Sequence, residues 1–180
     1  MSLFHSDAFL AFRSRDFSLL SVNQLCLILT IMIQEVVIAY SIYQLTQNPL
    51  SLGMIALIEL LPFICLSLIS GDWADRYNRQ KIVQWSFSCS TLIPLLFIVL
   101  FSQYQQQHIQ QNTLLCGIYS LIFCLGVLRG IYSPSFNSLR PFLTPESAYS
   151  NAATWTALIW QMGGILAPLC AGLLLGQLGL

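Results

Sequence analysis

Five long apolar segments divide this sequence, and their length restricts the fold more than any other feature. A helix needs ~20 mostly apolar residues to cross the hydrocarbon core of a bilayer. The five segments lie at about residues 17–45, 50–70, 82–102, 114–138 and 152–180. Because a membrane-spanning backbone must satisfy its own hydrogen bonds, we expect each segment to form a transmembrane α-helix. The sequence therefore predicts an all-α membrane protein with about five transmembrane helices.

The composition supports a membrane protein and gives no sign of an enzyme. Charged residues make up 8% of the 180 residues, whereas a soluble domain contains about a quarter. The seven basic and seven acidic residues cancel, so nothing indicates a nucleic-acid partner. The sequence has no metal-ligand spacing, Ser/His/Asp set or phosphate-binding loop, and we expect no catalysis, metal or cofactor. Its six cysteines all fall in apolar stretches, and we interpret them as small buried hydrophobic residues.

The basic residues predict the orientation in the membrane. Six of them would lie on one side if the five helices alternate in direction: Arg13, Arg15, Arg76, Arg79, Lys81 and Arg140. The connections on the other side contain no Lys or Arg. Because basic loops stay in the cytoplasm, we expect a cytoplasmic N-terminal tail over residues 1–16 and a C-terminus on the outer face. We also expect the protein to lie in a bacterial inner membrane.

Three ionisable residues lie within the apolar segments, namely Glu35, Glu59 and Arg129. A charge at membrane depth costs at least ~2.5 kcal/mol, so a function in proton coupling or substrate contact is the first hypothesis. A carboxyl group in apolar surroundings resists ionisation and can bind and release a proton. At about 1.5 Å per residue, Glu59 lies roughly 14 Å and Arg129 roughly 22 Å from the start of their segments. Alternatively, each glutamate is protonated or hydrogen-bonded to polar neighbours such as Asn23, Gln24 or Gln34 and helps the helices pack.

The densest run of charge is GDWADRYNRQK, residues 71–81, which we call the charged segment. Gly71 lets another helix approach closely, and Asp75 can bind a helix N-terminus or a basic side chain. Its three basic residues can contact anionic lipid. Asn78 tolerates the left-handed backbone that a tight turn would require. Charge alone does not distinguish this design from a segment that only sets orientation.

The order of residues in the charged segment resembles the signature between helices 2 and 3 of the major facilitator superfamily, G-x-L-A-D-R-x-G-R-[RK]. The matching residues are Gly71, Ala74, Asp75, Arg76 and Arg79, with Lys81 one place beyond the terminal bases. The stretch RDFSLLSVNQL resembles the start of the exporter branch that includes siderophore and macrolide efflux proteins. Arg129-Gly130 partly resembles the family's intramembrane arginine motif.

The last apolar segment resembles the family's antiporter signature, G-x-x-x-G-P-x-x-G-G. The corresponding residues are Gly163, Ala167, Pro168, Ala171 and Gly172, so alanine replaces glycine at two positions. Alanine is still small, and close helix packing remains the expectation. It allows less backbone freedom than glycine, which weakens the inference of antiport.

The resemblance implies a secondary transporter that exports a small amphipathic molecule by alternating access between two six-helix halves. It also implies that Gly71, Asp75, Arg76, Arg79 and Lys81 form a conformational latch against the other half. The five helices would be part of the N-terminal half. We therefore expect a fragment whose partners are membrane lipid, a small-molecule substrate and the missing C-terminal half. The alternative is a non-transporting truncated remnant or a membrane interaction partner of another chain.

Overall fold

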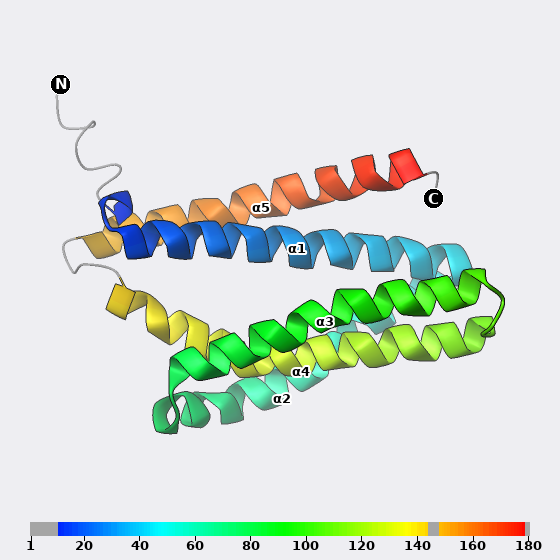
Figure 1. The fold of residues 1–180 in the computed structure, drawn as a ribbon, viewed down its shortest axis with the longest axis horizontal. Coiled ribbons are helices and arrows are strands. Elements are labelled where there is room, and N and C mark those ends of the chain that lie inside the picture. The colour runs from blue at the N-terminus through cyan, green and yellow to red at the C-terminus, as the bar shows by residue number, and fades with distance from the viewer. Residues whose placement is uncertain (1–10, 144–147, 179–180) are drawn as a thin grey trace. The chain divides into compact units, whose positions relative to one another are not determined.

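The architecture is entirely helical over the residues that a computed structural model describes, 11–143 and 148–178; the side chains of residues 13, 16, 74–76, 79, 139–143 and 178 are not described. The elements are η1 (Ala11–Arg13), α1 (Arg15–Thr46), α2 (Pro49–Arg76), α3 (Arg79–Gln105), α4 (Gln111–Leu143) and α5 (Tyr149–Leu178), as Figure 1 shows. All five α-helices are long and apolar enough to cross a membrane. The prediction of an all-α membrane protein is confirmed.

Helices α2 and α3 begin before the apolar limits that the sequence suggested, and a polar residue caps the start of each. Asn48 is the N-cap of α2, its side chain accepts a hydrogen bond from Leu50 N (3.0 Å), and Pro49 begins the helix. Asn78 is the N-cap of α3 with φ −67°, so the expectation of a left-handed backbone at Asn78 is wrong. Left-handed residues occur instead at Gln47 (φ 50°) and Gln107 (φ 59°), in the other two short turns.

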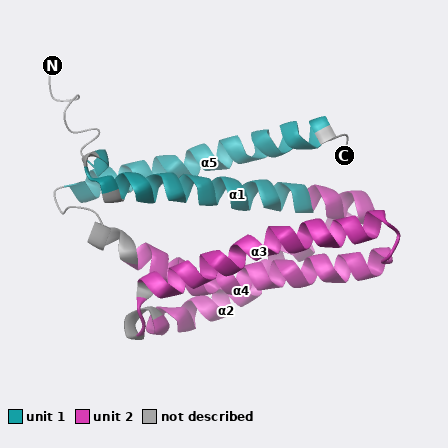
Figure 2. Cartoon of the chain, in the orientation of Figure 1, with its two compact units in different colours: residues 1–38, 140–180 teal, residues 39–139 magenta. Residues whose placement is uncertain are grey.

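The chain divides into two compact units (Figure 2). Unit 1 consists of Met1–Ile38 and Arg140–Leu180, and it therefore contains η1, most of α1, and α5. Unit 2 consists of Ala39–Leu139 and contains the end of α1 with α2, α3 and most of α4.

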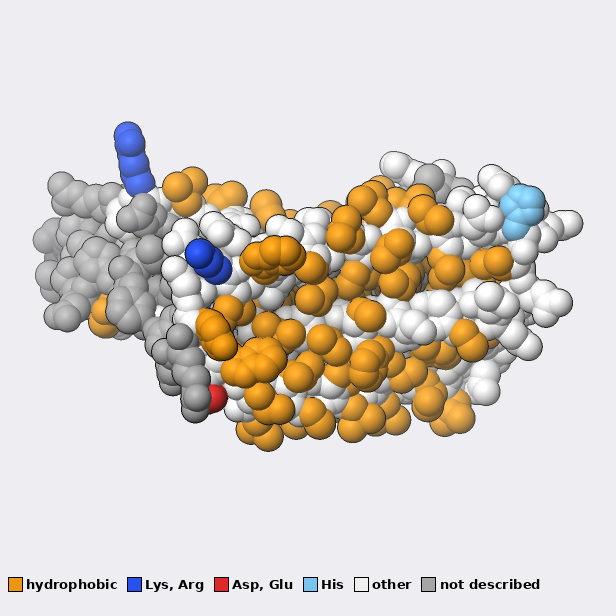
Figure 3. All heavy atoms as spheres, turned by 60° about the horizontal axis from the view of Figure 1, so that its bottom comes forward, with side chains coloured by type: hydrophobic (Ala, Val, Ile, Leu, Met, Phe, Trp, Pro, Cys, Tyr) orange, Lys and Arg blue, Asp and Glu red, His pale blue; other side chains and the backbone are white. Residues whose placement is uncertain are grey.

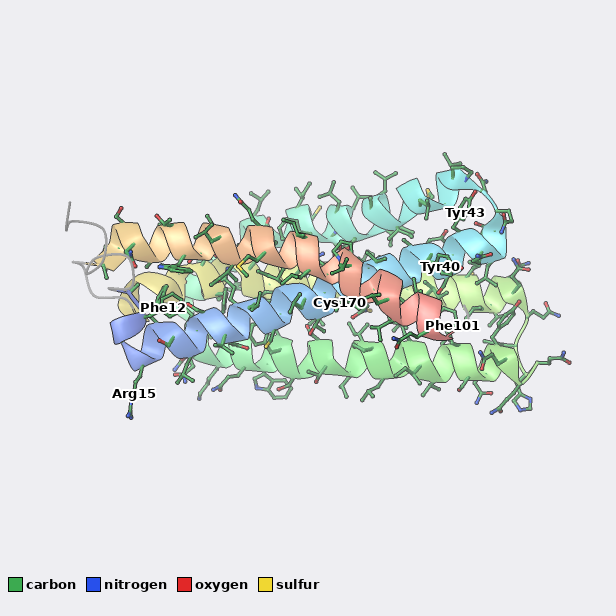
Figure 4. All side chains as sticks on the ribbon, turned by 90° about the horizontal axis from the view of Figure 1, so that it is seen from above. Phe12, Arg15, Tyr40, Tyr43, Phe101 and Cys170 are labelled. Carbon is green, nitrogen blue, oxygen red and sulfur yellow. The ribbon has the colours of Figure 1, made fainter. Side chains whose placement is uncertain are left out.

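In unit 1, α1 and α5 lie side by side and run in the same direction (Figures 1 and 4). Gly163 of α5 faces Ile28 of α1 so closely that an added Cβ would lie 3.2 Å from the Ile28 Cβ. Ala167 and Ala171 follow Gly163 at intervals of four residues and are fully buried. Residues four apart share a helix face, so a ridge of small residues packs α5 within this unit.

In unit 2, α4 packs against both α2 and α3. Its Gly117 contacts the tip of Leu100 on α3, and Tyr132 meets the ring of Phe87 edge to face at 5.2 Å. The core of the unit includes four isoleucine or leucine side chains that are almost completely buried: Ile42, Leu114, Ile118 and Ile122. Because α4 contacts both neighbours, its rotation about its own axis is fixed, and one face of α4 lies against α2.

Many large hydrophobic side chains point away from the protein interior. Leu68, Trp85 and Ile165 are each more than 70% exposed, and the face in Figure 3 carries hydrophobic side chains along the helices with few charges. Such a surface would be unfavourable in water but is suited to lipid tails, which are as apolar as leucine. The protein is an integral membrane protein.

Candidate functional site

The candidate functional site is an ion pair between α2 and α4, within unit 2. Arg129 donates a hydrogen bond from Nη1 to Oε1 of Glu59. Only 27% of the Arg129 side chain and 17% of the Glu59 side chain are exposed. Both residues come from apolar spans, so the pair lies where screening by water is weak and opposite charges attract strongly. The structure therefore brings together two of the three intramembrane charges found in the sequence.

Glycines on α4 allow the two helices to approach closely at this pair. A Cβ at Gly126 would overlap the carbonyl oxygen of Glu59 and would lie 2.8 Å from Pro62 Cγ. One turn further, a Cβ at Gly130 would lie 3.0 Å from both Phe63 O and Leu66 Cβ. Only a residue without a side chain fits these two positions unless α2 moves.

The side-chain direction of a helix explains how Arg129 reaches Glu59. Sequence counting placed the two residues at different depths, yet α2 and α4 run in the same direction with Glu59 beside Gly126. Helical side chains point back toward the N-terminus of their own helix. The long Arg129 side chain can therefore extend back by about one turn, to the level of Gly126.

A buried hydrogen bond closes this contact toward the C-terminal end of α2. Ser70 Oγ donates to the carbonyl oxygen of Gly130 at 2.6 Å, and Ser70 is only 2% exposed. Ser70 lies on the same face of α2 as Phe63 and Leu66. The face from Glu59 to Ser70 thus forms a continuous seam with α4, and sequence reasoning did not single out Gly126 or Ser70.

Glu35, the third intramembrane charge, lies on α1 in unit 1 and is partly buried. Two of the amide neighbours that the alternative names donate no hydrogen bond to a described residue through their side-chain nitrogen atoms. The Nε2 atoms of Gln24 and Gln34 are buried and have no hydrogen-bond partner among the described residues. For Glu59, the partner is Arg129. A function of Glu35 in coupling stays a prediction.

The charged segment is mostly helical, although the apolar limits placed it between two helices. Gly71 and the next five residues form the last turns of α2, and the connection to α3 consists only of Tyr77 and Asn78. Asn78 Oδ1 accepts hydrogen bonds from Gln80 N (3.0 Å) and Lys81 N (3.4 Å), which caps α3. Capping by a polar residue makes so short a turn possible.

Two residues of the predicted latch are described with their surroundings. No heavy atom lies within 4 Å of a Cβ added at Gly71, so among the described residues no other helix makes the expected close approach there. Lys81 is exposed. The side chains of Asp75, Arg76 and Arg79 lie outside the described residues, and the function of this segment as a latch stays a prediction.

The packing motif of α5 divides between two faces of the helix. Gly163, Ala167 and Ala171 are buried and form the ridge described above. Pro168 and Gly172 are exposed, and no described heavy atom lies within 4 Å of a Cβ at Gly172. The expected helix packing thus applies to three of the five residues, because two that follow in the sequence point to another face.

The start of the chain contributes a contact that sequence reasoning missed. Ala11 of η1 donates its backbone N–H to Asn151 Oδ1 of α5 at 3.2 Å. The Phe12 ring packs edge to face on the rings of Trp155 and Phe17, with ring centroids 4.9 Å and 5.4 Å apart respectively. Figure 4 shows Phe12 near the start of α1, with Arg15 pointing away. The aromatic residues that flank the first apolar segment were the available signal.

The cysteines are less buried than their apolar surroundings suggested. Four are exposed and two are of intermediate exposure: Cys26, Cys65, Cys116 and Cys124, and Cys89 and Cys170. The expectation that they are buried is wrong, because a helix in lipid can turn apolar side chains outward. No group of three or more metal-binding side chains occurs in the part of the chain that the structure describes.

Comparison with known proteins matches most of the helical region. The family described as the Major Facilitator Superfamily matches residues 20–180. The Staphyloferrin A transporter of Staphylococcus aureus (strain NCTC 8325 / PS 47) is 24% identical over 128 residues, which are 71% of this chain and 31% of that protein. The uncharacterized MFS-type transporter YkuC of Bacillus subtilis (strain 168) is 29% identical over 106 residues, 57% of this chain and 22% of that protein.

A second Bacillus subtilis (strain 168) protein, the uncharacterized MFS-type transporter YfiS, is 24% identical over 139 residues, 77% of this chain and 30% of that protein. No solved structure matches the chain. The matched region spans less than a third of the length of each of these relatives. Five apolar helices and a family match over nearly the entire sequence lead to one assignment: the chain belongs to the Major Facilitator Superfamily.

Proposed function

We propose that this chain supplies five helices of a secondary transporter that exports a small amphipathic molecule by alternating access. The observation that carries the proposal is the Glu59–Arg129 ion pair inside two apolar helices. Charged side chains at membrane depth are costly and typically mark ion or substrate pathways. Family membership and the similarity to a protein named as a staphyloferrin A transporter support transport of a small molecule.

In this proposal, the ion pair is the chemical switch. A proton that reaches Glu59 neutralises its carboxylate and weakens its hold on Arg129. An anionic group of a substrate can compete with Glu59 for the Arg129 guanidinium, which binds carboxylates well. Either event changes the charge between α2 and α4, and such a local change can bias a transporter between two access states.

The deciding experiment compares transport by the full-length protein that carries these helices with transport by this chain alone, both in proteoliposomes. We expect proton-driven efflux of a fluorescent dye or of staphyloferrin A from the full-length protein, and no coupled efflux from the 180-residue chain. Glu59→Gln should abolish the proton dependence, whereas Asp72→Asn, at an exposed end of α2, should not. Full-length protein that moves neither solute under a proton gradient would refute the proposal.

We also propose that the N-terminus is cytoplasmic and that the charged segment acts as a latch. Single cysteines at Gln106 and Lys81, both exposed and separated by α3, should be labelled from outside and inside respectively; labelling from one side would refute the topology. In the full-length protein, Asp75→Asn should impair efflux more than Lys81→Gln, since it removes the acidic group of the latch. Equal effects would mean that the segment only sets orientation.

A further inference from the structure

Two of the three glycines on α4, Gly126 and Gly130, face the backbone of α2. At Gly126, the atom that obstructs a side chain is the backbone carbonyl oxygen of Glu59, the same residue that carries the paired carboxylate. At Gly130, the obstructing atoms are Phe63 O and Leu66 Cβ, one turn along α2. A side chain at either position must therefore displace the α2 backbone and not only a mobile side-chain tip.

Gly117 on the same helix provides an internal contrast. A Cβ there would lie 2.8 Å from Leu100 Cδ2 and 2.9 Å from Cδ1, so it is as crowded by distance as the contact of Gly126 with Pro62. However, the neighbouring atoms are the end of a flexible leucine on α3, which can rotate to another rotamer. An added methyl group at Gly117 can be accommodated without moving a backbone.

We propose that Gly126, supported by Gly130, is a positioning residue for the Glu59–Arg129 ion pair. The bare face of α4 holds the α2 backbone at the distance at which the Glu59 carboxylate meets the Arg129 guanidinium. Helices with larger side chains at their contact lie ~8–10 Å apart, and small residues permit a closer approach. The inference deepens the proposed function, on which it rests for its consequence in transport, but the ion pair itself can be tested in this chain alone.

The atom that a side chain at residue 126 would strike belongs to Glu59 itself, so a substitution there acts directly on the ion pair. A methyl group at residue 126 pushes the backbone of Glu59 away from α4, and its carboxylate moves with it. Arg129 stays on α4, so the change separates the two partners directly. The space opened between the helices also admits water, which screens the charges and weakens the attraction of the pair further. A methyl group at residue 117 leaves both partners in place.

The test measures the coupling between Glu59 and Arg129 in this 180-residue chain, folded in lipid–detergent micelles and unfolded with a denaturing detergent. A double-mutant cycle of Glu59→Gln and Arg129→Met gives the coupling as a ratio of unfolding equilibrium constants. The cycle is then repeated with Gly126→Ala and with the matched control Gly117→Ala. We expect a coupling of about a hundredfold in the parent chain, near the upper end of the usual range for contacting charged residues. It should remain with Ala at 117 and fall to within about twofold of unity with Ala at 126.

The infrared band of the Glu59 carboxylate provides a second readout, which a purely structural effect would not move. It is isolated as the difference between each protein and its Glu59→Gln counterpart. Gly126→Ala should shift this band toward that of an unpaired carboxyl group, and Gly117→Ala should not. If Gly126→Ala lowers stability but leaves the coupling and the band unchanged, Gly126 only packs the helices and the inference is wrong.

Gly130→Ala keeps the inference testable if the Gly126→Ala protein does not fold. Its Cβ would meet atoms at 3.0 Å, which requires a smaller shift of α2. For Gly130→Ala, we expect a coupling that is weaker than in the parent chain but still measurable. A coupling equal to that of the parent would overturn the inference. An absence of coupling in the parent chain would also overturn it, whatever the full-length protein transports.

Discussion

Two helix contacts in this protein each place a glycine against a neighbouring helix, but the glycines face different kinds of group. In the α1–α5 contact of unit 1, Gly163 faces the Ile28 side chain, and the ridge continues with alanines. In the α2–α4 contact of unit 2, Gly126 faces a backbone carbonyl, and the seam holds an ion pair and a buried serine. Apolar packing can adjust by moving side chains. A polar contact needs fixed partners, because unpaired polar groups in lipid are costly.

The largest effect should follow from breaking the ion pair of the polar seam. Arg129→Met leaves Glu59 without its partner in an apolar span, and we expect a loss of roughly 3 kcal/mol in the free energy of unfolding. The double variant Glu59→Gln/Arg129→Met should recover most of this loss, since it leaves no buried charge. Circular dichroism during unfolding in mixed micelles gives both values. A double variant as unstable as the single one would show that Arg129 acts through packing.

A smaller effect should follow from crowding the apolar contact. Gly163→Ala places a methyl group against the β-branched and therefore stiff Ile28, and overpacking of this kind should cost about 1–2 kcal/mol. The neighbouring Gly164 provides the control, because no described heavy atom lies within 4 Å of a Cβ there. Gly164→Ala should be neutral or slightly stabilising, since alanine favours helix. If both variants lose the same free energy of unfolding, the two faces of α5 do not differ in how tightly they pack.

The difference between the two contacts also marks how far the sequence could predict the structure. Each helix is encoded by its own run of apolar residues, so the number and approximate limits of the helices followed from local composition. Glu59 and Arg129 stood out by their charge, but they are 70 positions apart and nothing local pairs them. Gly126 and Ser70 were not recognisable, because a glycine or serine in an apolar helix acquires meaning only from the helix that it faces.

The contact between the N-terminal residues and α5 also could not be predicted from the sequence. Residues before the first apolar segment were predicted as a tail because hydropathy is low there. The structure begins α1 at Arg15, and Phe12 packs on Trp155, over 140 positions away. Hydropathy measures affinity for lipid. It does not report that a short polar stretch can pack against the end of a distant helix.

The third prediction tests that N-terminal contact within unit 1. Asn151→Ala removes the acceptor of the Ala11 N–H, and we expect a local loss of about 1 kcal/mol. Hydrogen exchange should accelerate at the amide of Ala11 and through the first turn of α1. Asn23→Ala, an exposed position on α1, should leave these amides unchanged. Unchanged exchange in the Asn151 variant would mean that the aromatic cluster of Phe12 and Trp155 suffices to hold the segment.

The smallest effect should come from the hydrogen bond at the end of the polar seam. Ser70→Ala removes the donor to Gly130 O, and hydrogen bonds between helices in lipid contribute ~0.6 kcal/mol on average. Ser67→Ala is the matched control, because the Ser67 hydroxyl donates to Ile64 O within the same helix at 2.9 Å. Ser70→Ala should lower the free energy of unfolding by about this amount and Ser67→Ala by less, since a carbonyl inside a helix keeps its backbone partner. A loss of several kcal/mol at Ser70 would indicate that this bond and the ion pair hold α2 and α4 together as one cooperative network. If Ser70→Ala and Ser67→Ala lower the free energy of unfolding equally, the Ser70 bond does not help to hold α2 against α4. The contact would then depend on Glu59, Arg129 and the glycines alone.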